Sequence, residues 1–213
     1  METRFREINA KDFPDVTIEL TPGHFVARHA HVNYYINPTP LKCYQKKARK
    51  AANALASQFL ALSPVDTIVC LDGAEIIATH LAALLSKKGG YTQHADNDIA
   101  IVTPENNVAG QLIFRDNTQG MIRSKNVVLL VASAITGKTI GQAVRCIHYY
   151  GGTVSAICAL FSAVKEVDGL PVNAIFTRND VPDYETYKPE VCPMCKASVK
   201  IDALVNNYGY SKL

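Results

Sequence analysis

The chain has 213 residues, of which 48% are hydrophobic and 19% charged, and its formal net charge is +3. This length supports one main domain with a well-filled core and smaller appendages. No apolar run is long enough to span a bilayer, and the first residues lack the apolar core of a signal peptide, so we expect a soluble, cytoplasmic protein with no membrane partner. The basic cluster at residues 46–50 lies on an expected amphipathic helix and indicates a solvated helix face, not a nucleic-acid-binding surface.

Residues 1–40 predict a small N-terminal hood segment. Residues 16–20 alternate like a half-buried strand, Pro22 and Gly23 indicate a turn, and residues 24–37 indicate further extended structure. Three histidines in this stretch have neither helical spacing nor a nearby carboxylate, so we expect partly exposed polar side chains and no metal site there. They are His24, His29 and His31.

Strands and helices alternate through residues 41–180, the predicted core. The Ala-rich stretch 41–62 predicts one helix, with Ala51, Leu55 and Ala56 facing inward. This order predicts an α/β fold with a mainly parallel sheet flanked by helices, in which ligands bind beyond the carboxyl ends of the strands. The expected strands are 66–71, 98–103, 127–131, 154–160 and 172–176, and the expected later helices are 76–85 and one that begins near residue 140.

A short turn between a strand and a helix is the most informative motif. The buried strand 127–131 is followed by Thr136, Gly137, Lys138 and Thr139, and then by a helical pattern. Backbone N–H groups and the positive end of the helix dipole converge on such a turn. We therefore expect it to bind a phosphate, to which Lys138 either adds a cation or contributes nothing as an exposed lysine.

Two interpretations of this turn are open. With Ala132 in place of the first glycine, residues 132–139 nearly match the P-loop of nucleoside triphosphatases. The alternative is a loop that binds the 5′-phosphate of a ribose. A P-loop normally follows the first strand of its domain, whereas this turn follows two strand–helix units, which weakens the triphosphatase interpretation.

A second turn follows the predicted strand 66–71 and should line the same cleft. It consists of Asp72, Gly73, Ala74 and Glu75. Asp72 and Glu75 have the oxygen atoms to hold Mg²⁺ through water, and the competing role for Asp72 is to cap the following helix.

The tail, residues 181–213, contains a Cys-x-x-Cys pair, Cys192 and Cys195. One such pair is half of a zinc site. Either a zinc ion completed by His or Cys from elsewhere in the chain or from a second subunit, or a pair of reduced thiols, fits this pattern. The remaining cysteines, expected to be reduced and buried, are Cys43, Cys70, Cys146 and Cys158.

Taken together, these motifs resemble the orotate phosphoribosyltransferase branch of the type I phosphoribosyltransferases. Tyr34 and Tyr35 begin a Tyr-Tyr-Ile-Asn segment similar to one in the hood of those enzymes. Residues 66–78 resemble the strand and turn that cover the pyrophosphate, and residues 127–140 resemble the motif that binds phosphoribosyl pyrophosphate (PRPP). The tail with its Cys-Pro-x-Cys sequence is similar to the C-terminal segment of one bacterial and archaeal subgroup.

The resemblance implies transfer of phosphoribosyl from PRPP to a pyrimidine-type base with Mg²⁺, in pyrimidine nucleotide biosynthesis, by a homodimer. It also implies that the loop of Thr136 to Thr139 binds the 5′-phosphate of PRPP or of a nucleotide 5′-monophosphate. The turn at residues 72–75 would then face the pyrophosphate. Tyr34 and Tyr35 would contact the base, with packing in the core as the competing role.

The sequence departs from the family pattern where the family acts on the sugar and on the leaving group. Two adjacent acidic residues that hold the ribose hydroxyls in the family correspond here to Val131 and Ala132. The catalytic acid of related purine enzymes corresponds to Ile135. Within a predicted mobile surface loop, residues 104–111 contain no Lys, Arg or His, where the family has basic residues and a His-Gly pair.

These departures leave two functions open for a chain of this family. Displacement of pyrophosphate passes through a charge-separated state, which needs fixed cations and an oriented sugar. Asp72 and Arg115 are candidate catalytic replacements, as is Arg123, and exposed arginine is the competing interpretation of the last two. The alternative is a catalytically silent paralogue that binds a nucleotide 5′-monophosphate as a sensor or regulatory subunit.

Overall fold

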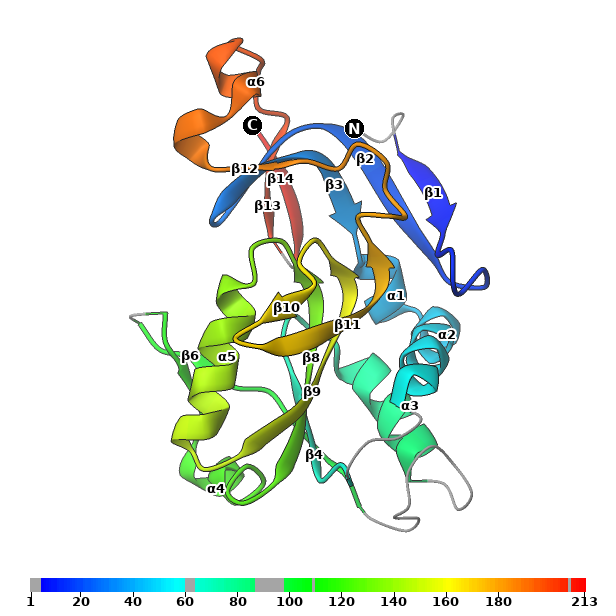
Figure 1. The fold of residues 1–213 in the computed structure, drawn as a ribbon, viewed down its shortest axis with the longest axis vertical. Helices are drawn as coiled ribbons and strands as arrows, with labels where there is room; N and C mark the ends of the chain where they lie inside the picture. Colours follow the sequence, from blue (N-terminus) through cyan, green and yellow to red (C-terminus); the bar gives the residue numbers. More distant parts are fainter. Residues whose placement is uncertain (1–4, 60–63, 87–97, 109, 207) are drawn as a thin grey trace.

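The structure is a computed structural model and describes residues 5–59, 64–86, 98–108, 110–206 and 208–213. No helix within these ranges is long and apolar enough to cross a membrane. The described chain builds two main sheets, stacked end to end along the long axis of the molecule (Figure 1).

The larger sheet forms the predicted α/β core. Its strand order is β10-β11-β9-β8-β4-β5, and all neighbouring strands are parallel except β10, which pairs antiparallel with β11. Alternate residues of β8 enter two different hydrophobic clusters, so this strand is buried on both faces, as its apolar run predicts. The strands are β4 Thr67–Cys70, β5 Ala100–Val102, β8 Asn126–Ala134, β9 Thr153–Ser162, β10 Glu166–Val167 and β11 Leu170–Thr177.

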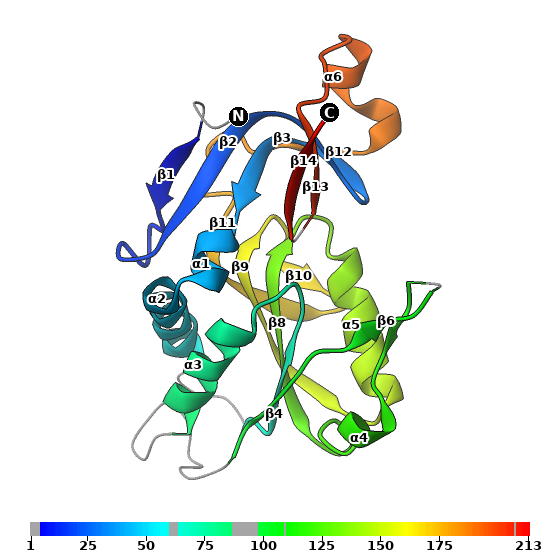
Figure 2. The same cartoon turned by 180° about the vertical axis from the view of Figure 1, so that it is seen from behind.

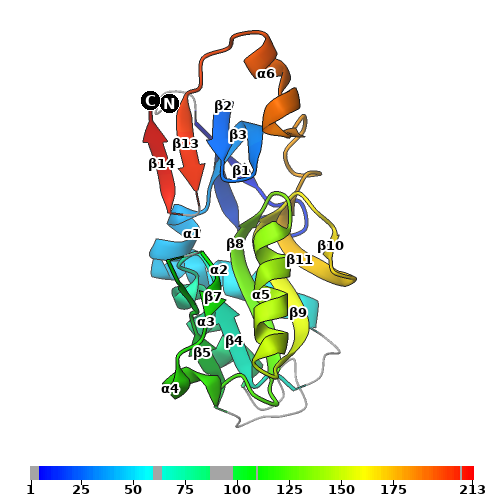
Figure 3. The same cartoon turned by 90° about the vertical axis from the view of Figure 1, so that its left-hand side faces the viewer.

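Helices cover both faces of this sheet. Helix α5 (Lys138–Tyr149) packs on one face, and α2 (Gln45–Ala56) and α3 (Glu75–Leu85) pack together on the other (Figures 1 and 3). Ala51, Leu55 and Ala56 of α2 are buried, as their spacing predicts. The mainly parallel sheet flanked by helices is therefore confirmed.

The predicted single helix 41–62 is wrong. Helix α1 (Thr39–Cys43) ends at Tyr44, whose backbone is extended (φ −95°, ψ 117°), and α2 starts one residue later. Pro40 explains the early start, because proline favours the first turn of a helix. A short 3₁₀ helix, Ser57–Phe59, follows α2, and residues 60–62 lie outside the described ranges.

The smaller sheet is a hood made from both ends of the chain (Figures 1 and 2). Its order is β12-β3-β2-β13-β14, and β1 pairs with β2. The predicted turn at Pro22 and Gly23 is wrong, because β2 runs through both residues with only a register shift between Pro22 and Phe25. The strands are β1 Arg6–Asn9, β2 Thr17–Ala27, β3 Ala30–Asn37, β12 Thr186–Tyr187, β13 Ala203–Asn206 and β14 Gly209–Lys212.

Between the sheet strands β5 and β8, the chain makes a small separate unit. The hairpin of β6 (Glu105–Asn106) and β7 (Leu112–Ile113) is followed by α4 (Asp116–Gln119). Two short helical segments in the tail, Pro189–Val191 and α6 (Pro193–Lys196), lie on the far side of the hood from the core (Figure 1).

Candidate functional site

A cavity of about 500 Å³ lies between the core and the hood. Its lining combines the turn after β8, the end of β4, the β2–β3 hairpin and the C-terminal strands. Ligand-binding crevices in open α/β sheets occupy the same place, beyond the carboxyl ends of the strands. The lining residues that carry the argument are Arg28, His29, Tyr34, Asp72, Thr136 and Lys138.

The predicted phosphate turn lines this cavity from Thr136 to Thr139. Gly137 is the N-cap of α5 and has a left-handed backbone, with φ 74°. A Cβ atom at this position would lie 2.7 Å from Cγ2 of Val167, so the turn needs glycine for both its conformation and its space. The first backbone N–H groups of α5, which a helix leaves without intrahelical partners, therefore open beside the cavity.

Positive charge gathers around this turn. Arg28 and His29 form the turn between β2 and β3, and both line the cavity together with Lys138. Burial lowers the pKa of the His29 imidazole, and the charges of Lys138 and Arg28 lower it further. Arg28 and Lys138 therefore supply the positive charge, and His29 supplies an imidazole that can donate a hydrogen bond. Asp72 is the one acidic residue among the described lining residues. The cavity end at the phosphate turn thus favours an anion.

No local sequence pattern indicates that Arg28 and His29 are site residues. Their contribution depends on the fold-back of the hood over the core, which joins residues 28–29 to residues 136–139. A pattern of local spacing cannot reveal such an approach, whereas the turn itself is a contiguous motif.

The turn after β4 reaches the cavity through Asp72. Asp72 has φ 65°, and its carboxylate accepts a hydrogen bond from the backbone N–H of Ala132 (3.4 Å). The helix-capping role considered for Asp72 is wrong, because α3 has Ala74 as its N-cap and no side-chain capping bond. Gly73, Ala74 and Glu75 are not among the lining residues.

Lys42 and Thr103 hold the turn at residues 72–75 through hydrogen bonds. The ammonium group of Lys42, which is 6% exposed, donates a hydrogen bond to the carbonyl oxygen of Asp72 (2.6 Å). Burial lowers the pKa of Lys42, and the charge of Asp72 opposes that shift. Glu75 accepts a hydrogen bond from the hydroxyl of Thr103 (2.9 Å). Lys42 was missed by the sequence analysis because it adjoins a cluster of surface lysines.

The two hood tyrosines differ. Tyr35 is 5% exposed and packs against Phe25 and Tyr210, with ring centroids 6.0 and 5.4 Å away, and burial raises the pKa of its hydroxyl to about 12. Tyr34 is half-buried in the cavity wall, and the guanidinium of Arg6 lies 5.8 Å from its ring centroid. Tyr34 is therefore the better placed of the two to meet a ligand.

Comparison with solved structures identifies the fold. An orotate phosphoribosyltransferase from Aeropyrum pernix superposes with a TM-score of 0.54 at 18% identity, over 75% of this chain and 88% of that one. A phosphoribosyltransferase from Corynebacterium diphtheriae gives 0.52 at 17% identity, over 76% and 90%. This chain has the type I phosphoribosyltransferase fold. Leishmania donovani UMP synthase gives 0.55 at 16% identity over 75% of this chain, and the match spans 34% of that longer protein. The sequence matches no family model.

The two residues that the sequence resemblance predicts to correspond to the family's acidic pair are closed to a ligand. Val131 and Ala132 are 1% and 0% exposed and belong to β8, which continues to Ala134. Ile135, which the resemblance predicts to correspond to the catalytic acid of the purine enzymes, lines the cavity. None of these three side chains can accept a hydrogen bond or bind a metal ion.

The two arginines considered as catalytic replacements lie outside the described cavity lining. Arg115 is exposed and pairs with Glu105 across the β6–β7 hairpin (2.7 Å). Arg123 packs beside Gly151, which precedes β9, whereas the phosphate turn follows the opposite, carboxyl end of the neighbouring parallel strand β8. The cationic side chains that line the cavity are therefore Arg28 in the hood and Lys138 in the phosphate turn.

The two cysteines of the tail lie close to two histidines of the hood. Cys192 and Cys195 lie with His24 and His31 in one cluster whose ligand atoms are all within 4.8 Å of one another. The expectation that these histidines are partly exposed is wrong, because His24 is 1% and His31 8% exposed. They point from neighbouring strands to one face of the hood, where the tail covers them. Of the other cysteines, Cys70 and Cys158 are buried as expected, whereas Cys43 is exposed.

Proposed function

We propose that this protein binds a nucleotide 5′-monophosphate and acts as a sensor or regulatory protein. The observation that carries this proposal is the phosphate turn, which opens with Lys138 into a cavity that also contains Arg28 and His29. A helix N-terminus with a glycine-containing turn binds phosphate mainly through backbone N–H groups, so the site does not depend on the missing acidic pair.

The remainder of the cavity suits the nucleoside. Its volume of about 500 Å³ is within the range of small-molecule sites, and its wall is largely apolar with a few polar groups. Tyr34 offers a ring face to a planar base, and Asp72 offers a carboxylate to a sugar hydroxyl or to Mg²⁺. A pyrimidine base is the choice that the resemblance to orotate phosphoribosyltransferases supports.

Calorimetry with a matched set of ligands tests this proposal. UMP, orotidine 5′-monophosphate and AMP are compared with uridine, which lacks the phosphate, and with ATP and GTP in the presence of Mg²⁺. We expect the monophosphates to bind and uridine to bind at least about tenfold more weakly, the loss of a charge-assisted contact. Absence of monophosphate binding would refute the function, and a preference for the triphosphates would return the P-loop interpretation.

Substitution of Lys138 gives a second readout. Lys138→Ala should weaken UMP binding by about three- to tenfold, because an exposed cation contributes modestly beside backbone donors. Lys50→Ala, an exposed lysine on α2, is the control and should leave the affinity unchanged.

A second candidate function is transfer of phosphoribosyl from PRPP to a pyrimidine-type base with Mg²⁺. Arg28, Lys138 and His29 favour it, since two cations and an imidazole that can donate a hydrogen bond match a pyrophosphate better than a single phosphate. Release of pyrophosphate from PRPP that depends on an added base, with orotate first in the panel, would establish it. PRPP binding without release would leave the sensor function in place.

The resemblance also supports a homodimer in the cytoplasm with a role in pyrimidine nucleotide metabolism. In the family, sites are built close to the subunit interface, so the nucleotide could bind across two subunits. Light scattering at several protein concentrations, with and without UMP, measures whether a dimer forms and whether the ligand stabilises it.

A further inference from the structure

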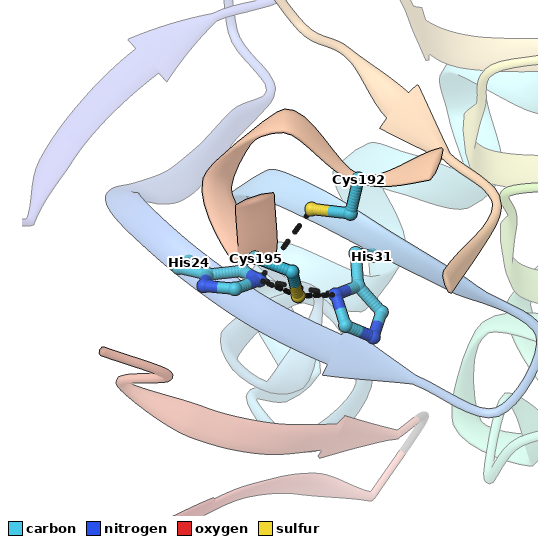
Figure 4. Close-up of side chains that lie close together, drawn as sticks. All are labelled: His24, His31, Cys192 and Cys195. Atoms are coloured by element: carbon cyan, nitrogen blue, oxygen red, sulfur yellow. Dashed lines mark hydrogen bonds between the residues drawn. The ribbon is translucent and has the colours of Figure 1, made fainter. Parts of the chain in front are cut away.

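Four side chains from opposite ends of the chain converge on one point at the outer face of the hood (Figure 4). His24 is on β2 and His31 on β3, and Cys192 and Cys195 flank the first turn of α6. Val26 pairs with His31 across the two strands, so His24, two residues away, lies on the same face of the sheet. The rings of the two histidines are 5.1 Å apart between centroids.

Four distances among the ligand atoms are close to the edges of a zinc tetrahedron, and all pairs of ligand atoms lie within 4.8 Å. Nε2 of His24 lies 3.6 Å from each cysteine sulfur, and Nδ1 of His31 lies 3.3 Å from the sulfur of Cys195. The two ring nitrogens are 3.0 Å apart. Zinc bound tetrahedrally by two imidazoles and two thiolates would have N···S edges of about 3.6 Å and an N···N edge of about 3.3 Å. A hydrogen bond between the rings would explain one distance, but not the approach of both sulfurs to the same point.

The outer partners of His24 prepare it to be a ligand. Its Nδ1 lies 2.9 Å from the carbonyl oxygen of Val199, which makes Nδ1 the protonated donor and leaves the lone pair of Nε2 facing the cluster. Metal-bound histidines are commonly oriented in this way by a carbonyl or carboxylate. Asp202 ties the same strand to the tail, because its carboxylate accepts the N–H of His24 (2.9 Å) and its N–H donates to the carbonyl of His24 (2.8 Å).

The tail that carries the cysteines has almost no core of its own. Among residues 185–202, all of which the structure describes, Cys192 is the only buried residue. A segment of this kind buries too little apolar surface to offset its ordering, and small units of this kind are held by disulfides or metal ions. The cysteines are free thiols in the structure.

We propose that this chain holds a structural zinc ion, bound by Nε2 of His24, Nδ1 of His31 and the sulfur atoms of Cys192 and Cys195. All four positions of the tetrahedron are then filled by protein, which is the arrangement of structural zinc and leaves no place for a catalytic water. Two thiolates also balance the charge of Zn²⁺ at a partly buried site. The zinc ion staples the tail to the β2–β3 hairpin.

The proposed zinc site also affects the position of two residues that line the cavity. His24 and His31 stand on either side of the turn that carries Arg28 and His29, and Ala27 pairs with Ala30 at the base of that turn. Bound zinc would therefore fix the strands that carry Arg28 and His29 beside the cavity. This consequence rests on the proposed nucleotide binding, whereas the zinc site itself does not.

Zinc content tests the site directly. Untagged protein purified under reducing conditions should contain one zinc per chain by plasma mass spectrometry. The exposed ligand variant Cys195→Ser and the variant His31→Asn should lose zinc to a chelator that leaves the wild type loaded. Cys43→Ser and His148→Asn, which alter an exposed thiol and an exposed imidazole elsewhere, are the matched controls and should retain it. A zinc-free wild type, or Cys195→Ser with full zinc after the chelator, would overturn the proposal.

Cobalt substitution keeps the test valid if the variants fold poorly. The metal is removed from the folded wild type and replaced with Co²⁺, which should give tetrahedral d–d bands and a thiolate-to-cobalt charge-transfer band that added Zn²⁺ abolishes. A spectrum without the thiolate band would overturn the assignment. UMP affinity is then measured on the loaded and metal-free wild type, and we expect it to be about threefold or more weaker without zinc. Zinc without UMP binding would refute the proposed function alone, and UMP binding without zinc would refute the metal site alone.

Discussion

The phosphate turn (residues 136–139) and the hood cluster (His24, His31, Cys192 and Cys195) would bind their proposed ligands in opposite ways. At the phosphate turn, backbone N–H groups at the start of α5 face the cavity, and Gly137 matters because of its conformation. At the hood cluster, four side chains meet on the proposed zinc ion, and the backbone contributes only the carbonyl that orients His24. The first site should therefore tolerate many side-chain changes but few backbone changes. The second should fail when any one side chain is replaced.

Removal of zinc should have the largest effect. Structural zinc in small domains contributes on the order of 10 kcal/mol to folding, and even a fraction of that lowers the Tm of a 213-residue chain by roughly 5 °C or more. Differential scanning calorimetry before and after chelation, and again after zinc is restored, measures the shift. Limited proteolysis should show cleavage appearing first within residues 185–202. A Tm that is unchanged by chelation would mean that the four side chains of the hood cluster do not hold a structural zinc ion.

Adding a carboxylate beneath the phosphate turn should have the next largest effect. Ala132→Asp places a charge at a fully buried position whose N–H already binds the carboxylate of Asp72. Burial and like-charge repulsion should lower the free energy of unfolding by at least about 3 kcal/mol. The substitution should not create phosphoribosyl transfer activity. Denaturant unfolding measures the cost. Ser133→Asp, at a half-buried neighbouring position, is the control and should cost less. Equal stability of Ala132→Asp and the wild type would show that the acidic pair can be restored.

A backbone change at the turn should come third. Gly137→Ala forces a Cβ atom to within 2.7 Å of Val167 in a left-handed conformation, which should cost about 1–3 kcal/mol and weaken UMP binding by about tenfold or more. The control Gly120→Ala adds a Cβ atom that meets nothing within 4 Å. Zinc content should be unchanged in both variants. Unaltered UMP binding by Gly137→Ala would mean that the phosphate does not bind to this turn.

The smallest effect should come from the hood cation. Arg28→Ala should weaken UMP binding by about two- to fivefold at low ionic strength and by less at high salt, because Arg28 is exposed and its charge is screened. Arg49→Ala on α2 is the matched control. Calorimetry at two salt concentrations gives both numbers, and a salt-independent loss would indicate packing instead of charge.

The phosphate turn is contiguous in the sequence, whereas the hood cluster is assembled from both ends of the chain, and this difference explains what the sequence could predict. Strand, glycine turn and helix of the phosphate site are contiguous in residues 126–149, so local spacing and period were sufficient to predict the α/β core and the anion site. For Cys192 and Cys195, the sequence left open either half of a zinc site or a pair of reduced thiols. His24 was not joined to them, because 168 residues separate it from Cys192 and only the folding of both chain ends into one sheet brings them together.

Two other differences between the predicted and observed structure have causes that a local sequence pattern does not contain. The β2 strand passes through Pro22 and Gly23, where the tail approaches so closely that a Cβ atom at Gly23 would clash with the carboxylate of Asp202. Lys42 differs from its surface neighbours because α1 and α2 are separate helices, which turns this one lysine inward. Both results depend on tertiary contacts and not on propensity.

The position of a bound nucleotide phosphate tests the central claim most directly. A crystal structure of the protein with UMP should show the 5′-phosphate within hydrogen-bonding distance of the backbone N–H groups at Gly137, Lys138 and Thr139, with the base toward Tyr34. A nucleotide whose phosphate instead lies on the exposed lysines of α2, or anywhere else away from this turn, would contradict the account.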